Sequence, residues 1–198
     1  MAFLLLKIFY SLFVCVLVPA YWTRYGPSNF LWFSDLALLL GLAALWLESP
    51  LLASTQALSV VVFELIWIAD FLVRAVSGKS PIGIAAYMFD PAEPRFFRGL
   101  SLFHVPLPFV LLGAVYRWGY DARALIAQTL LFWLVMIVCY FFTSPSKNIN
   151  WAFGPGNPPR KLMPAPLYLV FLLIGVPLLV YLPTHLLLEA VAPPAGSF

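Results

Sequence analysis

The chain has 198 residues, of which 63% are hydrophobic and only 10% are charged, and its formal net charge is +3. An ordinary soluble domain carries about 25% charged residues, so this composition excludes a water-soluble fold. The basic residues are too few and too scattered for a nucleic-acid-binding surface. No polar stretch is long enough for a separate soluble domain. We therefore expect residues 1–198 to form a single integral membrane domain.

Six mostly apolar stretches of membrane-crossing length follow one another along the chain. Proline, glycine and charged residues separate them. The first stretch continues to an aromatic pair without a small-residue cleavage site, so we expect it to be retained. The predicted fold class is all-α, a polytopic bundle of six transmembrane helices at about residues 3–22, 29–46, 51–73, 99–116, 124–142 and 166–188.

Six crossings place both termini on one side of the membrane, which we name side A; the opposite side is side B. Side A carries Lys7, Arg117 and Arg123. Basic residues favour the cytoplasmic side, so we expect side B to face the cytoplasm and the protein to be multi-pass in a bacterial inner (cytoplasmic) membrane. The basic residues of side B are Arg24, Arg74, Lys79, Arg95, Arg98, Lys147, Arg160 and Lys161.

A few ionisable residues lie inside the apolar stretches or at their edges, where such groups are expensive to keep. At a rise of about 1.5 Å per residue, Asp35, Asp70 and His104 fall in the side B half of the membrane, and Glu64 lies nearer the midplane. At side A we find only His185, which we interpret as interfacial. A random scatter would not favour one leaflet, so the pattern predicts a polar cluster near side B.

The acidic members of this cluster have structural alternatives. Asp70 and Arg74 have the i, i+4 spacing of a pair on one helix face, and Asp35 could cap its helix or pair with Arg98. Glu64 has no basic residue one turn away on its own helix. It must therefore be protonated, paired across helices or facing water, and we expect it to face the bundle.

His104 is the residue best suited to proton transfer near neutral pH. Ser101 lies one turn earlier and could hydrogen-bond the ring, while Pro106 and Pro108 follow closely. Because proline has no backbone N–H, these prolines should kink the helix and free acceptors beside the imidazole. A buried structural histidine is the alternative interpretation.

Other chemical motifs do not occur in this sequence. It contains no CxxC, HExxH or GxSxG motif and no phosphate-binding glycine loop. Cys15 and Cys139 lie in apolar stretches, where cysteine behaves as a small hydrophobe. We expect no metal and no cofactor. The expected partners are membrane lipids or further membrane subunits, and not nucleic acid.

Three sequence blocks, at residues 25–35, 98–108 and 148–151, resemble those of bacterial six-helix integral membrane proteins of unassigned function. His104 with its following prolines also resembles the histidine helix of the androgen-inducible six-helix membrane lipid hydrolases. Those enzymes cleave fatty acid esters of hydroxy fatty acids with a threonine and a histidine. The resemblance implies a lipid hydrolase with His104 in its site. The threonine position falls near Leu31, and the nearest hydroxyl belongs to Ser34.

The first functional hypothesis is a lipid-active hydrolase or acyltransferase. His104 acts as general base, Ser34 is the nucleophile, and Asp35 or Asp70 orients the imidazole. A cavity open to side B is then expected, lined by Ser34, Asp35, Ser101 and His104. The residues expected to bind substrate beside this site are Glu64, Ser101 and Arg98.

The second hypothesis is a non-catalytic membrane component, namely a small-solute or proton carrier or a subunit of a larger complex. In this case Glu64 and His104 form a buried polar network. A Ser34 hydroxyl within hydrogen-bonding distance of the His104 ring would favour the enzyme. A pair between Glu64 and His104, with Ser34 facing lipid, would favour the second hypothesis.

Overall fold

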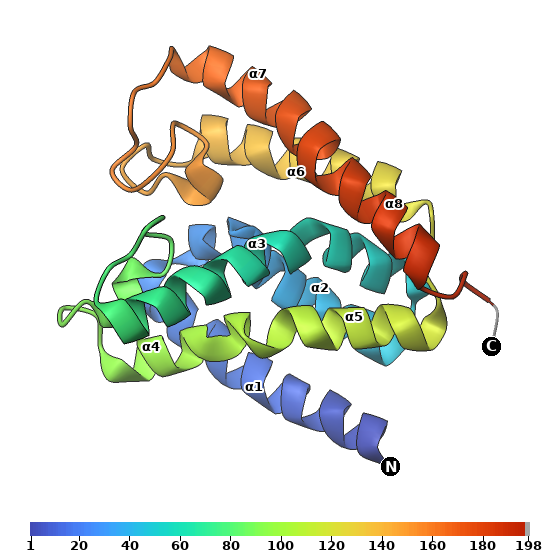
Figure 1. Ribbon diagram of the computed structural model, residues 1–198. Helices are drawn as coiled ribbons and strands as arrows, with labels where there is room; N and C mark the ends of the chain where they lie inside the picture. The colour runs from blue at the N-terminus through green and yellow to red at the C-terminus, as the bar shows by residue number, and fades with distance from the viewer. Residues whose placement is uncertain (197–198) are drawn as a thin grey trace.

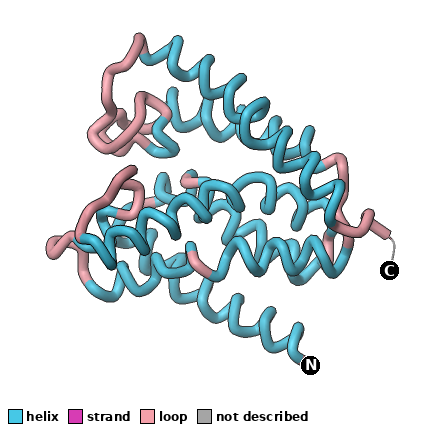
Figure 2. Tube along the Cα trace, in the orientation of Figure 1, coloured by secondary structure: helices cyan, strands magenta, loops and turns pink. Residues whose placement is uncertain are grey.

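The structure is a computed structural model that describes residues 1–196, and within them the chain is all-helical. Loops gather at the two ends of the helical body (Figure 2). The described residues form no strand. One isolated β-bridge joins Tyr120 to Pro194 and fixes the end of the chain beside the turn after α5.

Eight α-helices follow in chain order: α1 Ala2–Tyr25, α2 Phe33–Leu47, α3 Pro50–Ser77, α4 Arg95–Ser101, α5 Pro106–Trp118, α6 Ala124–Phe142, α7 Ala165–Val176 and α8 Leu182–Val191. Short 3₁₀ segments connect several of them, at η1 Pro27–Leu31, η2 Ala86–Phe89, η3 Leu102–His104 and η4 Ile149–Trp151. The segment η5, Pro177–Tyr181, is a π-helix between α7 and α8.

Among residues 1–196, five helical segments are long and apolar enough to cross a membrane: Phe3–Tyr25, Pro50–Ser77, Arg95–Trp118, Ala124–Phe142 and Ala165–Val191. Such helices are compatible with a multi-pass membrane protein. The apolar helix α2 has only 15 residues, about 22 Å at the α-helical rise. The sequence placed its start at residue 29. It starts at Phe33 because Pro27 opens a 3₁₀ turn and Trp32 has an extended backbone.

Helix α3 lies at the centre and packs against α2, α5 and α6, while α1 packs against α2 on the outside. In Figure 1 the segments α6, α7 and α8 form a layer on the opposite side of α3 from α1. The start of α1 and the end of α8 lie at the same end of the bundle as the α2–α3 and α5–α6 turns, which is side A. The longer loops lie at side B.

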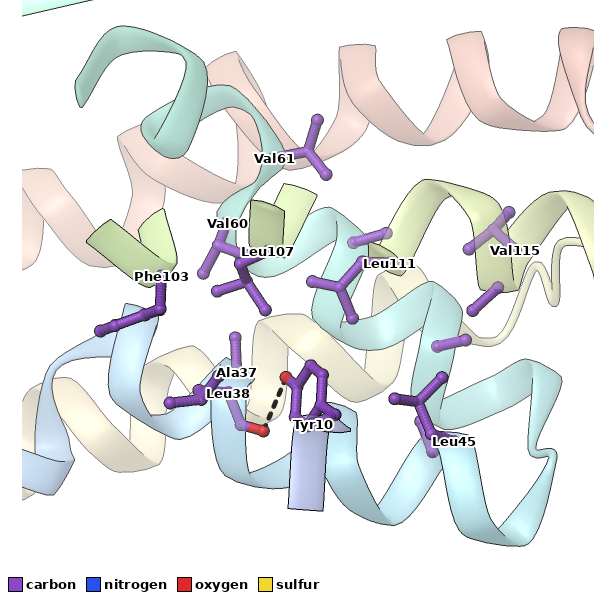
Figure 3. Close-up of a cluster of buried hydrophobic side chains, with 14 of the residues drawn as sticks. Tyr10, Ala37, Leu38, Leu45, Val60, Val61, Phe103, Leu107, Leu111 and Val115 are labelled. Carbon is purple, nitrogen blue, oxygen red and sulfur yellow. Dashed lines mark hydrogen bonds between the residues drawn. The ribbon is translucent and has the colours of Figure 1, made fainter. Parts of the chain in front are cut away.

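The largest apolar core lies between α1, α2, α3 and α5 (Figure 3). The Tyr10 hydroxyl crosses from α1 and donates to the carbonyl of Leu38 at 2.9 Å. A Cβ built on Gly41 would lie 2.8 Å from that hydroxyl and 3.4 Å from a methyl of Leu111. Glycine at this position therefore permits the close approach of α1 to α2.

The fourth apolar segment is interrupted at His104, as its prolines predicted. Helix α4 ends at Ser101, η3 follows, and α5 begins at Pro106. Pro106 has no N–H to offer the carbonyl of Leu102, which instead accepts from the N–H of Val105 at 3.0 Å. This tighter turn presents His104 toward α3.

We expect cysteines introduced at Glu48 and Arg123 to react from one side of the membrane, and cysteines at Lys79 and Lys161 from the other. The reason is the grouping of the α2–α3 and α5–α6 turns at one end of the bundle. Labelling with a membrane-impermeant maleimide, in a protein whose own Cys15 and Cys139 are replaced by alanine, measures this. Labelling of Glu48→Cys and Lys79→Cys from the same side would contradict a crossing by α3.

Candidate functional site

Glu64 on α3 and His104 on η3 form a buried pair. The distance between Glu64 Oε2 and His104 Nδ1 is 2.7 Å. Glu64 is 1% exposed, so it faces the bundle as the sequence predicted. The imidazole stacks on Trp67, at a centroid distance of 4.5 Å, and on Phe103, at 4.3 Å. These contacts fix the ring in the orientation that Glu64 requires.

The two ring nitrogens of His104 have different surroundings. When Glu64 is ionised it can only accept, and Nδ1 then carries the proton in their hydrogen bond; the opposite tautomer requires a protonated Glu64. Nε2 has no side-chain or backbone partner among the described residues, and the imidazole is 13% exposed. In the neutral ring Nε2 then holds the free lone pair. It is the atom of this pair that can accept a proton from outside.

Asp35, in the first turn of α2, is a second buried carboxylate on a helix that packs against α3, and it is 4% exposed. No hydrogen bond joins it to Glu64 or His104 within the described residues. Asp35 Oδ2 accepts a hydrogen bond from the Asn29 amide at 2.9 Å. The alternative pairing with Arg98 is wrong, since Arg98 donates to the carbonyl of Met88 at 3.2 Å.

The charges of this cluster are not balanced by fixed cations. No lysine or arginine among residues 1–196 forms an ion pair with Asp35 or Glu64. Asp35 Oδ1 and Glu64 Oε1 are both buried without a hydrogen-bond partner. Two buried carboxylates of the same charge repel each other when both are ionised. Two dissociable protons, in addition to the N–H of the neutral imidazole, make the three groups neutral together.

Asp70, predicted as one possible partner of the imidazole, holds the loop after α3 instead. The pair of Asp70 with Arg74 is not formed either, and the Arg74 guanidinium lies over the Phe89 ring at 5.6 Å. The two carboxylate oxygens of Asp70 accept four hydrogen bonds, from the Ser80 hydroxyl and the backbone N–H groups of Ile82, Gly83 and Ala85.

The hydroxyl groups assigned to the site do not reach the imidazole. The Ser101 hydroxyl lies 2.8 Å from the Tyr21 hydroxyl and forms a hydrogen bond with it, and not with the ring as the sequence predicted. Ser34 is half-buried, and its side chain makes no hydrogen bond within the described part of the chain. The observed pairing of Glu64 with His104 is one of the two features expected under the second hypothesis.

A groove of about 450 Å³ lies on the α1 side of Phe103. None of the four residues expected to line a cavity beside His104 lines this groove, because the Phe103 ring stands between it and the imidazole. Its walls are almost entirely hydrocarbon, from Leu6, Tyr10, Phe13, Leu38, Gly99, Leu102, Phe103, Pro106, Leu107 and Val110.

A second buried polar group, which the sequence analysis missed, joins α3, α6 and η5. The Gln128 amide donates to the Ser59 hydroxyl at 3.0 Å and to the Tyr181 hydroxyl at 3.1 Å. Gln128 Oε1 is buried and has no partner. The sequence does carry a signal for this group, namely a glutamine and a serine in the middle of apolar stretches.

A third group lies at side A around His185, which is 9% exposed. The Tyr120 hydroxyl lies 2.7 Å from His185 Nδ1, and Glu189 Oε2 lies 3.7 Å from His185 Nε2. Burial raises the pKa of Tyr120 above its ordinary value. Next to it, a hydrogen bond from Arg123 lowers the pKa of Asp121.

No three His, Cys, Asp or Glu side chains among the described residues are grouped so that they could hold a metal ion. No protein-family model, curated protein or solved structure matches this chain.

We expect Asp70→Asn to lower the free energy of unfolding by about 1.5 to 3 kcal/mol, because an amide N–H₂ would face backbone donors where a carboxylate oxygen now accepts. Thermal unfolding in detergent measures this. Asp90→Asn is the matched control, since Asp90 lies in the same loop and accepts one exposed bond from Ala92. Equal stability of the two variants would contradict the structural role of Asp70.

Proposed function

We propose that the protein is a non-catalytic multi-pass membrane component that carries protons, with Glu64, His104 and Asp35 as its proton-binding site. The observation that carries this proposal is a buried site with two carboxylates, one imidazole and no paired lysine or arginine. A proton is the cation that fits such a site without further ligands. The unpartnered oxygens of Asp35 and Glu64 are available for it.

The pair offers a direct proton-transfer step. A proton from side B binds His104 Nε2, and the Nδ1 proton then passes to Glu64 Oε2 across 2.7 Å. The N–H bond at Nε2 forms, the N–H bond at Nδ1 breaks, and an O–H bond forms on Glu64, so the ring is neutral again with its proton on Nε2 and Glu64 is uncharged. Trp67 and Phe103 hold the ring in place during the exchange.

The proposed setting is a bacterial inner membrane crossed by six helices, with α2 as the short crossing beside the five long ones. Side B, which carries most of the basic residues, faces the cytoplasm in this proposal. Membrane lipids cover the apolar outer faces. The site then lies in the cytoplasmic half of the membrane.

A lipid hydrolase is the second candidate, and the free Nε2 of His104 favours it. Glu64 would orient the imidazole as the carboxylate does in a catalytic triad, and Nε2 would activate a water molecule, because Ser34 makes no bond to the ring. An acyl chain would occupy the apolar groove beside Phe103.

In liposomes with a trapped pH-sensitive dye, we expect the wild-type protein to conduct protons down an imposed pH gradient. Glu64→Gln and His104→Gln should each lower the flux by about a hundredfold, the typical contribution of a positioned proton-transfer group. Glutamine at position 64 keeps an acceptor for His104 Nδ1, so folding should persist. Ser34→Ala is the control and should keep the wild-type flux.

Two outcomes would contradict the proposal. Absence of wild-type flux would overturn it, as would unchanged flux in Glu64→Gln. Release of fatty acid from an ester lipid, lost in His104→Gln, would establish the hydrolase instead. If Ser34→Ala also abolished that release, Ser34 would be the nucleophile.

A further inference from the structure

The last helical segment carries polar residues on the face that meets the bundle. Tyr181, His185 and Glu189 are spaced four residues apart, so they lie above one another on one side of the helix. Each interval corresponds to a rise of about 6 Å. Glu189 is half-exposed at side A, His185 is 9% exposed, and Tyr181 is fully buried. The series runs from the surface into the bundle.

Tyr181 connects this series to the central helix. Both its hydroxyl and that of Ser59 accept a hydrogen bond from the Gln128 amide. Each hydroxyl therefore keeps its own proton free to donate elsewhere. The π-helix η5 ends at Tyr181, and π-helical turns shift the side chains that follow them. This turn brings the phenol to Gln128 without breaking the segment.

No hydrogen bond joins Tyr181 to His185 within the described residues, and one helical turn of about 6 Å separates them. A second interval separates Ser59 from Glu64 on α3. Five residues correspond to a rise of about 7.5 Å, too long for a direct hydrogen bond. Glu64 Oε1 and Gln128 Oε1 are both buried and unpartnered. Buried polar atoms of this kind are satisfied by water, which typically makes about three hydrogen bonds in such places. Water at these two oxygens would join the two groups.

We propose that a proton path crosses the whole bundle, from His104 and Glu64 at side B, through water, Ser59 and Tyr181, to His185 and Glu189 at side A. This inference rests on the proposed function, since it needs Glu64 and His104 to exchange protons. It assigns to Gln128 the role of a positioning residue. The amide orients the hydroxyls of Ser59 and Tyr181 and takes up no proton itself.

The proton balance is the same at each step. A group accepts a proton at one atom and releases another, so an O–H or N–H bond forms while one breaks. At side A, His185 Nε2 exchanges with the Glu189 carboxylate, and Glu189 exchanges with water. Reorientation of the hydroxyls and of the rings then resets the path.

Charged and titratable groups flank both ends of the path. Near Glu64 these are Asp35 from α2 and Tyr87 from η2, whose ring lies 6.5 Å from that of Trp67. At side A, Tyr120 bonds His185 directly, and Asp121 is held by its bond to Arg123 at 2.7 Å. Neither end has a lysine or arginine bonded to the path residues among the described part of the chain.

The test is proton flux in liposomes with Tyr181→Phe, which removes one hydroxyl and keeps the ring that packs against Phe132 at 5.6 Å. Tyr168→Phe is the matched control, because Tyr168 is buried on α7 and its hydroxyl forms no hydrogen bond within residues 1–196. We expect Tyr181→Phe and Gln128→Leu to lower the flux by about tenfold or more. Tyr168→Phe should keep the wild-type flux.

A change in pH dependence provides a second readout. His185→Asn should alter how flux depends on the pH at side A while leaving its dependence on the pH at side B unchanged, which a merely structural defect would not do. Low flux in Glu64→Gln together with wild-type flux in Tyr181→Phe, Gln128→Leu and His185→Asn would overturn the path and leave the proposed function standing. Absence of wild-type flux would overturn both.

Discussion

The hydrogen bond between Glu64 and His104 is the constraint on which the arrangement of this bundle depends. A carboxylate that is 1% exposed on an apolar helix costs several kilocalories per mole unless a partner reaches it. The partner reaches it because the fourth apolar segment breaks before Pro106 and turns His104 toward α3. Trp67 from α3 then stacks on the imidazole. Burial of Glu64 therefore depends on both the helix break and the aromatic stacking.

The same requirement explains why α3 occupies the centre. It carries buried polar groups along its whole length, and the α5–α6 turn, α6 and η3 each supply a partner for one of them. The N–H of Asp121 donates to Ser54, Gln128 donates to Ser59, and His104 pairs with Glu64. Between apolar helices the hydrophobic effect gives little direction, so polar contacts of this kind fix which helices are neighbours. An outer position for α3 would leave these groups in lipid.

The sequence predicted the position of the apolar helices well and the pairing of their side chains poorly. Hydropathy located the apolar helices, the isolation of Glu64 placed it inside the bundle, and the prolines predicted the break near His104. The possible bond of Ser101 to the ring was inferred from their spacing on one helix, and the possible pair of Asp35 with Arg98 from their positions in the sequence. Neither kind of inference says which faces of two helices meet. The partners of Asp70 could not be predicted from the sequence, because they depend on how an irregular loop folds back over its own helix.

The loop after α3 also explains why the two ends of the proposed proton path differ. At side A, Glu189 is half-exposed and meets the surroundings directly. At side B, Asp70 holds the start of the loop after α3, and Arg98 binds the carbonyl of Met88 near its end. The loop thereby brings Tyr87 to within 6.5 Å of the Trp67 ring, beside the buried cluster. Asp70 therefore influences the surroundings of the site without touching it, because it anchors the loop that carries Tyr87.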